Sequence, residues 1–250
     1  SSDEMQGRRT FSPGIDKAAS FIADEFKKAG LQPGAGSSYF QEFTLFRTKF
    51  ISAAGEINGV TVDSRNVVGL TTQPTINIAQ SSGYDLVVIG PKDTLMPAIR
   101  RMQANKKNYF VVVDTTHRRL FNSLKSSRRE MFPSDNSIIL ILSSEVVNSY
   151  KAEFKQELTE MKLMNVVGIL PGKKKKEEYV IFSGHYDHLG TGRPNKEADS
   201  IFNGANDDAA GTTAVMMLAH YFARKKDNER TMVFAAFTAE EIGGYGSLYF

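Results

Sequence analysis

The sequence contains no cysteine, which excludes disulfide bonds, cysteine nucleophiles and thiolate metal ligands. No apolar run approaches the roughly 18 residues that a membrane-spanning helix needs, so we expect no transmembrane segment. A nucleophile elbow of the form G-x-S-x-G, a P-loop and a dinucleotide-binding G-x-G-x-x-G turn are also missing. The common serine-hydrolase and nucleotide-binding functions are therefore not indicated.

Charge is nearly balanced, with a formal net charge of +3 over 250 residues, and the hydrophobic content of 41% is ordinary for a globular protein. One stretch departs from this balance, because nine Lys or Arg residues lie between Arg100 and Arg129 beside a single acid, Asp114. No nucleic-acid-binding motif accompanies them. A solvated rim of helices is favoured over a nucleic-acid or membrane partner.

The first 54 residues predict a helix followed by an extended segment. Ser12 is suited to cap the helix, Pro13 to its first turn and Gly30 to its end. Apolar residues between them recur at spacings of three and four, as an amphipathic helix requires. After a glycine-rich loop, residues 40–51 are expected to be extended.

Residues 55–163 change to short β-rich runs and interleaved helices, which predicts an inserted α+β module. We expect strands at 60–62, 66–70, 85–89, 109–113 and 137–142, and helices at 96–105, 117–126 and 144–155. The run Tyr109–Val113 is apolar on both faces and should lie in the middle of a sheet.

Residues 164–250 alternate strands with a helix. We expect strands at 165–170, 179–184 and 231–237, a helix over 208–224 and the start of another at 246–250. This pattern predicts an α/β fold, with a mixed, mostly parallel sheet flanked by helices and the smaller module inserted into it.

Three short motifs bring histidine and carboxylate groups to one edge of this sheet. HYDHLG begins at His185, directly after a strand, GANDDAAG opens the helix at 208–224, and AEEIG follows the strand at 231–237. Ligands of open α/β sheets bind beyond the carboxyl ends of the strands. Imidazole nitrogens and carboxylate oxygens held there are suited to divalent metals such as zinc.

The first motif offers His185 as a metal ligand and Asp187 as its partner. Two residues apart, they do not easily bind one ion together, but Asp187 can accept the other ring N–H of His185 and orient the imidazole. His188 lies three residues on, and in an extended chain it would point to the opposite face, so we leave it out of the ligand set. A lone histidine at a strand end is usually structural; the neighbouring motifs favour a ligand here.

The other two motifs offer paired carboxylates. Of Asp207 and Asp208, one can serve the helix start, and the other can bridge two cations. Of Glu240 and Glu241, one can bind a metal while its neighbour transfers protons as general base and acid. Two acidic residues at a helix start are common without function, but all three motifs together favour a metal site.

The combination HYDHLG, GANDDAAG and TAEEIGGYGS resembles the family of two-zinc aminopeptidases, which includes glutamate carboxypeptidases, the transferrin receptor and glutaminyl cyclases. The opening segment EMQGRRTFSPG resembles the start of the peptidase domain, and residues 55–163 resemble, more weakly, its inserted protease-associated domain. This divides the chain into 1–54, 55–163 and 164–250, the last being the first half of the catalytic domain.

The resemblance assigns a role to each motif residue. It implies that His185 binds one zinc ion, that Asp207 is shared by both and that Glu241 binds the other. Glu240 becomes the general base and acid, and Asp187 the partner of His185. It also implies a cis peptide bond between Asp207 and Asp208, and two further zinc ligands, an aspartate and a histidine, from a segment expected to follow Phe250.

The implied activity is a zinc-dependent exopeptidase, most simply an aminopeptidase acting on peptides and located outside the cytoplasm, secreted or periplasmic. The 250 residues alone are not expected to turn over substrate. Two alternatives stay open: a non-catalytic binding or scaffold protein of the same fold, and a glutaminyl cyclase that uses a single zinc ion.

Overall fold

The computed structural model describes residues 1–126 and 129–250. The chain forms two compact units: unit 1 comprises Ser1–Phe43 and Lys162–Phe250, and unit 2 comprises Thr44–Met161. These divisions fall at 43/44 and 161/162, whereas the sequence places them at 54/55 and 163/164. No helix in the described ranges has both the length and the hydropathy to cross a membrane.

Unit 1 is built on a mixed β-sheet. Strand β14 (Arg230–Phe237) pairs in parallel with β11 (Lys175–His185) on one side and antiparallel with the end of β10 (Tyr150–Leu170) on the other. The short β1 (Gln32–Pro33) adds antiparallel to β10. The predicted α/β class with a mixed sheet is thereby confirmed, although only one of these three pairings, β11 with β14, is parallel.

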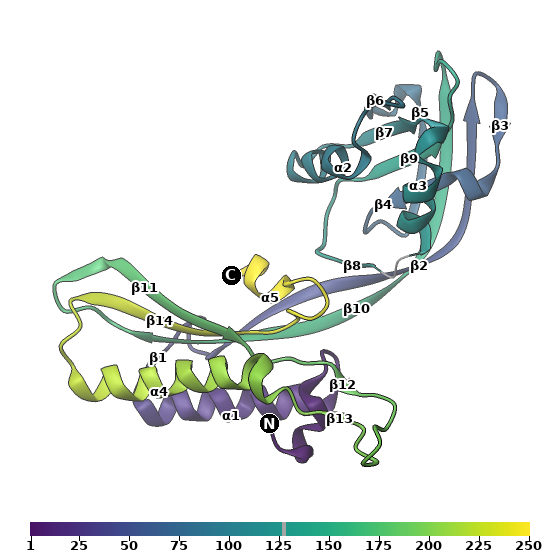
Figure 1. Cartoon of the computed structure of the whole chain (residues 1–250). Coiled ribbons are helices and arrows are strands. Elements are labelled where there is room, and N and C mark those ends of the chain that lie inside the picture. Colours follow the sequence, from purple (N-terminus) through teal and green to yellow (C-terminus); the bar gives the residue numbers. More distant parts are fainter. Residues whose placement is uncertain (127–128) are drawn as a thin grey trace. The chain divides into compact units, whose positions relative to one another are not determined.

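Two helices cover one face of this sheet, as Figure 1 shows. They are α1 (Pro13–Ala29) and α4 (Ala210–Lys225), and they pack with Phe234 of β14 and Phe182 of β11 into one apolar core. On the other face, Phe250, which follows the short helix α5 (Tyr245–Tyr249), contacts the ring of Phe237 at a centroid distance of 5.3 Å. Five of the eight residues of β14 are buried, and they lie on both faces of the strand.

The predicted bounds of α1 are confirmed. The helix follows Ser12 and ends at Gly30, whose φ of 81° is the left-handed conformation expected at a helix end. The Ser12 hydroxyl does not cap a helical N–H, however, and instead donates to the carbonyl oxygen of Arg9.

Unit 2 contains a four-stranded sheet in the order β4–β9–β7–β6, comprising Val67–Leu70, Ile138–Leu142, Tyr109–Val113 and Asp85–Ile89. Every residue of β7 is buried, as predicted for a strand inside a sheet. Helices α2 (Leu95–Ala104) and α3 (Arg118–Ser126) contribute to the apolar core on one face. On the other face, Tyr150 stacks on Phe110 with a centroid distance of 3.8 Å.

Further strands border this module. Strand β2 (Phe40–Ile57) pairs with β3 (Val60–Val62) and with β8 (Arg129–Met131), and β5 (Thr75–Ala79) pairs with the first part of β10. The sequence analysis did not predict β5 or β8.

The predicted helix at 144–155 is wrong. Residues 150–157 instead form the start of β10 and alternate strictly between buried and exposed positions. Tyr150, Ala152 and Phe154 face the core of unit 2. A two-residue period of this kind is the signature of a strand with one buried face, and it outweighs the helix propensity of the intervening Lys and Glu residues.

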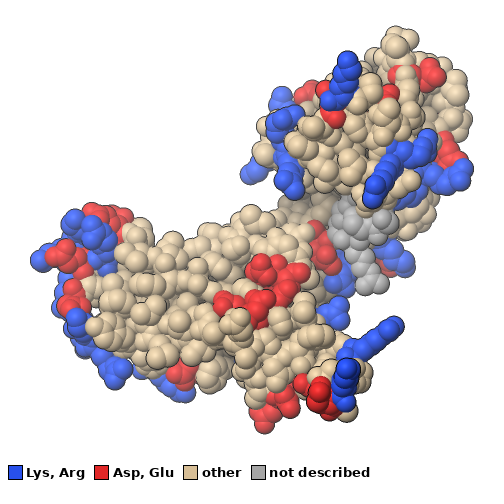
Figure 2. Space-filling view, in the orientation of Figure 1, with Lys and Arg blue, Asp and Glu red and all other residues tan. Residues whose placement is uncertain are grey.

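The basic residues of unit 2 stand apart from one another on the visible surface in Figure 2. Arg100, Arg101, Arg118 and Arg119 are all exposed, and Lys107 pairs with Asp85 at 3.5 Å. Arg128 lies outside the described residues. The arrangement is that of a solvated surface.

Removing the Phe234 side chain is expected to destabilise unit 1. Phe234 is fully buried against Phe26 and Phe182, so Phe234→Ala should lower the free energy of unfolding by about 3–5 kcal/mol. Phe21→Ala on α1, where the side chain is 49% exposed, is the matched control and should cost less than about 1 kcal/mol. Urea denaturation measures both, and equal losses would contradict this assignment of the core.

Candidate metal centre

Strands β11 and β14 end together at one edge of the unit 1 sheet. Their parallel register pairs His185 with Phe237, and the Tyr186 N–H donates to the Phe237 carbonyl oxygen at 2.9 Å. His185 is the last residue of β11, and Glu240 and Glu241 follow β14 by three and four residues. Two of the three sequence motifs therefore meet at this edge because of the strand register.

The second motif, GANDDAAG, reaches the same edge through Asp208. Its Oδ2 accepts the His185 backbone N–H at 3.2 Å, and its Oδ1 accepts the Gly211 N–H at 3.0 Å, at the start of α4. A Cβ atom at Gly211 would collide with the Asp208 carboxylate, so this close approach needs glycine. The peptide bond between Asp207 and Asp208 is cis, as the resemblance implies.

Asp187 is fully buried, and its carboxylate joins the first motif to the third. Oδ1 accepts the Glu240 N–H at 3.1 Å, and Oδ2 accepts the Glu241 N–H at 3.2 Å. Oδ2 also accepts the hydroxyl hydrogen of Thr10 at 3.0 Å. A buried carboxylate needs several such donors, and here they hold the backbone of both glutamates in place.

His185 lies between two carboxylates. Its Nε2 is 2.9 Å from Asp207 Oδ1, and its Nδ1 is 3.6 Å from Asp187 Oδ1 and 3.2 Å from the Asp187 carbonyl oxygen. In the metal-free chain, the hydrogen bond with Asp187 raises the pKa of His185 to about 9, against the opposing effect of burial. The two ring nitrogens of His185 thus face different carboxylates, Nε2 that of Asp207 and Nδ1 that of Asp187.

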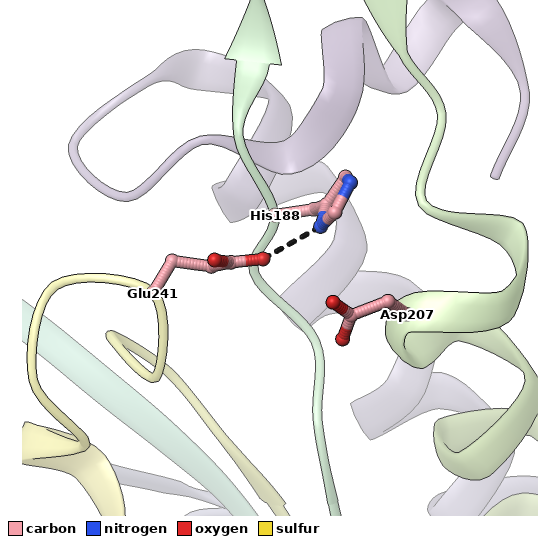
Figure 3. Close-up of side chains that lie close together, drawn as sticks. All are labelled: His188, Asp207 and Glu241. Carbon is pink, nitrogen blue, oxygen red and sulfur yellow. Dashed lines mark hydrogen bonds and ion pairs between the residues drawn. The ribbon is translucent and has the colours of Figure 1, made fainter.

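His188 also enters the site, although the sequence analysis left it out. Its Nδ1 lies 2.7 Å from Glu241 Oε1, and the two side chains face Asp207 across the gap shown in Figure 3. The ligand atoms of these three residues lie within 4.8 Å of one another. The alternation argument does not apply, because β11 stops at His185 and the next residues are not a regular strand.

Glu240 is placed differently from Glu241. Its side chain is 54% exposed, and its Oε2 lies 3.9 Å from His185 Nε2. Glu241 is mostly buried and is engaged by His188. The more accessible carboxylate is the one able to reach a substrate beside the metal-binding groups.

The residues present fit zinc. They supply two imidazoles and several carboxylates, which are nitrogen and oxygen donors that zinc accepts, gathered on one side of the sheet edge. The Asp187 carboxylate near the far nitrogen of His185 is the arrangement that commonly orients a zinc-bound histidine.

Arg8 and Thr10 contact this region from the start of the chain, and the sequence analysis gave neither a role. Arg8 donates to backbone carbonyls beside the first and second motifs, and Thr10 donates to Asp187. Burial lowers the pKa of the Arg8 guanidinium, while Asp187, Asp207 and Asp208 raise it. Both lie in the segment EMQGRRTFSPG that resembles the start of the peptidase domain, but the sequence does not indicate their partners, which are more than 170 positions away.

Comparison with known families identifies part of the chain. Residues 165–250 match the model of peptidase family M28. These residues contain all three motifs, so the resemblance to zinc aminopeptidases is confirmed for this segment.

Curated relatives of this chain are named as peptidases. A probable zinc metalloprotease of Pyricularia oryzae is 44% identical over 89 residues, which cover 36% of this chain and 17% of that protein. Aminopeptidase YwaD of Bacillus subtilis is 22% identical over 228 residues, which cover 88% of this chain and 43% of that protein. The chain thus spans less than half the length of either relative.

Among solved structures, an aminopeptidase from Aneurinibacillus sp. strain AM-1 is 17% identical, with a TM-score of 0.42 over 97% of this chain and 62% of that chain. A zinc aminopeptidase from Bacillus subtilis is 18% identical, with a TM-score of 0.43 over 99% of this chain and 61% of that chain.

The raised pKa of His185 predicts how the stability of the zinc-free chain changes with pH. The pKa rises from 6.5 in the unfolded chain to about 9 in the folded one. The imidazolium therefore stabilises the fold fully below pH 6.5, and this contribution is lost as the pH rises through 9. With a chelator present, Tm should fall more steeply over this range in the wild type than in His185→Gln. Parallel Tm curves would contradict the assignment.

Proposed function

Because residues 165–250 belong to peptidase family M28, we propose that this chain carries the metal-binding part of a zinc-dependent aminopeptidase, which removes N-terminal residues from peptides. The observation that carries the proposal is the position of Asp207. Its carboxylate is 2.9 Å from His185 Nε2 and also belongs to the compact group with His188 and Glu241.

Asp207 would hold both zinc ions of such a site. His185 would hold one ion and Glu241 the other, since the two side chains approach Asp207 from different segments. His188 hydrogen-bonds Glu241 and directs its carboxylate toward Asp207. The resemblance also implies two further ligands, an aspartate and a histidine, which the three motifs do not supply.

Zinc, when bound, polarises the scissile carbonyl group and lowers the pKa of water. Glu240 then accepts a proton from the attacking water and passes it to the amine that leaves. Its exposure and its position 3.9 Å from His185 Nε2 suit this role. Asp187 keeps Glu240 in place through the backbone N–H and holds the proton on the far nitrogen of His185.

From the resemblance to the family, we propose peptides with a free N-terminus as the substrate class and a secreted or periplasmic location. Two other functions make different predictions. A scaffold protein of this fold would bind no zinc at neutral pH. A glutaminyl cyclase would convert N-terminal glutamine to pyroglutamate rather than release an amino acid.

Glu240→Gln should abolish peptide hydrolysis without removing zinc. We expect a loss of kcat of about 10²- to 10⁴-fold, the usual contribution of a general base, with unchanged zinc content. Glu241→Gln should instead lower the zinc content itself. The assay is amino-acid release from short peptides by the complete polypeptide that contains these residues, with metal content measured alongside.

Glu177→Gln, an exposed change on β11 away from the site, is the matched control and should leave both quantities unchanged. Full activity of Glu240→Gln would remove the proposed base. A wild-type protein without zinc would favour the scaffold alternative, and pyroglutamate formation the cyclase.

A further inference from the structure

The first eleven residues of the chain are bound to the loops of the metal centre. This segment lies outside the region that matches the peptidase family. It contains the 3₁₀ turn Asp3–Arg8, and the His188 N–H donates to the Arg8 carbonyl oxygen at 3.1 Å. Arg9 and His188 form an isolated parallel bridge. The backbone of the first motif is therefore paired with the N-terminal segment.

The Arg8 side chain makes the most specific of these contacts. It is only 4% exposed, and its Nε donates to the Tyr186 carbonyl oxygen at 2.8 Å. From the other side of the same guanidinium, Nη1 donates to Asn203 O at 2.7 Å and Nη2 to Gly204 O at 3.1 Å. One planar group thus connects the loop after β11 with the turn that leads to Asp207.

Burying an arginine costs free energy unless its donors and its charge are both satisfied. Here three donors meet carbonyl oxygens, and Asp187, Asp207 and Asp208 supply the opposite charge. Those carboxylates repel one another in the metal-free chain, and the guanidinium offsets part of that repulsion. Arg8 is therefore placed to act on both the geometry and the charge of the site.

The rigid fork of the guanidinium is essential to this arrangement. Its donors point in fixed directions within one plane and reach acceptors on two separate loops at once. A lysine ammonium at the same position would keep the charge, but it is a single point that cannot span all three carbonyl oxygens. Replacing Arg8 with lysine therefore separates the effect of the hydrogen bonds between the two loops from the effect of the positive charge.

We propose that Arg8 is a positioning residue for the metal centre, which holds the loop 186–188 and the turn 203–204 at the separation that lets His185 and Asp207 bind the same ion. The proposal rests on the zinc site proposed above. Thr10 assists by fixing Asp187, which in turn holds Glu240 and Glu241.

The test compares zinc affinity and local hydrogen exchange in Arg8→Met, Arg8→Lys and Arg9→Met variants of the complete polypeptide that contains these residues. Zinc affinity, measured by competition with a chromogenic chelator, should fall about 10- to 100-fold in Arg8→Met, as is usual when a group that orients ligands is lost. Arg8→Lys should fall between Arg8→Met and the wild type. Arg9→Met removes the same charge from an exposed neighbouring side chain and should change affinity less than twofold.

Hydrogen exchange in the zinc-free chain gives a readout that does not depend on metal. Amides of residues 185–190 and 203–211 should exchange faster in Arg8→Met, whereas strand β7 in unit 2 should exchange as in the wild type. A wild type that binds no zinc would overturn the proposed function, and the exchange pattern would still decide the role of Arg8.

The positioning role is wrong if Arg8→Met keeps wild-type zinc affinity and wild-type exchange in these two segments. A uniform rise in exchange across unit 1 would also contradict it, because that result describes a general structural arginine. If Arg8→Met does not fold, Arg8→Lys decides by the same two measurements: wild-type values contradict the role, and weakened affinity with faster exchange confined to the two segments supports it.

Discussion

The buried carboxylate of Asp187 is the contact on which the candidate metal centre depends. It accepts the N–H groups of Glu240 and Glu241 and the hydroxyl of Thr10, and it lies 3.6 Å from the ring of His185. A carboxylate shielded from solvent needs hydrogen-bond donors. Asp187 can therefore stay buried only while these N–H and hydroxyl groups keep their positions. Through this one group, the loop after β14 is fixed to the loop after β11.

The parallel pairing of β11 and β14 makes this contact possible. Their register brings the ends of both strands to the same edge, where α4 also starts. Each motif then needs only a few residues beyond its regular element to reach the others. The chemistry of the site is therefore set by short loops at the edge of a sheet, one face of which is packed against α1 and α4.

Much of this arrangement could be predicted from the sequence. The apolar run of β14 and the helix between Ser12 and Gly30 each carry a local signal, and the structure confirms both elements. The helix predicted at 144–155 was wrong because the two-residue period from Tyr150 was overlooked. His188 was excluded by assuming extended backbone beyond β11, where the chain leaves the strand.

Other features had no local signal. Arg8 and Thr10 act on partners more than 170 residues away, and nothing in the composition of their segment indicates which loop they meet. The different contacts of Asp207 and Asp208 likewise depend on the turn before α4. Asp208 accepts two backbone N–H groups, whereas Asp207 faces the His185 ring. Residue type and spacing alone do not distinguish the two aspartates, whereas the family resemblance and the folded chain both do.

The central claim is that side chains from three segments bind zinc around Asp207. An anomalous difference map, recorded at the zinc absorption edge from crystals grown with zinc, tests this most directly. We expect zinc density about 2.0–2.2 Å from the Asp207 carboxylate and from His185 Nε2. Zinc bound elsewhere on the chain, with His185 and Asp207 free of metal, would contradict the account.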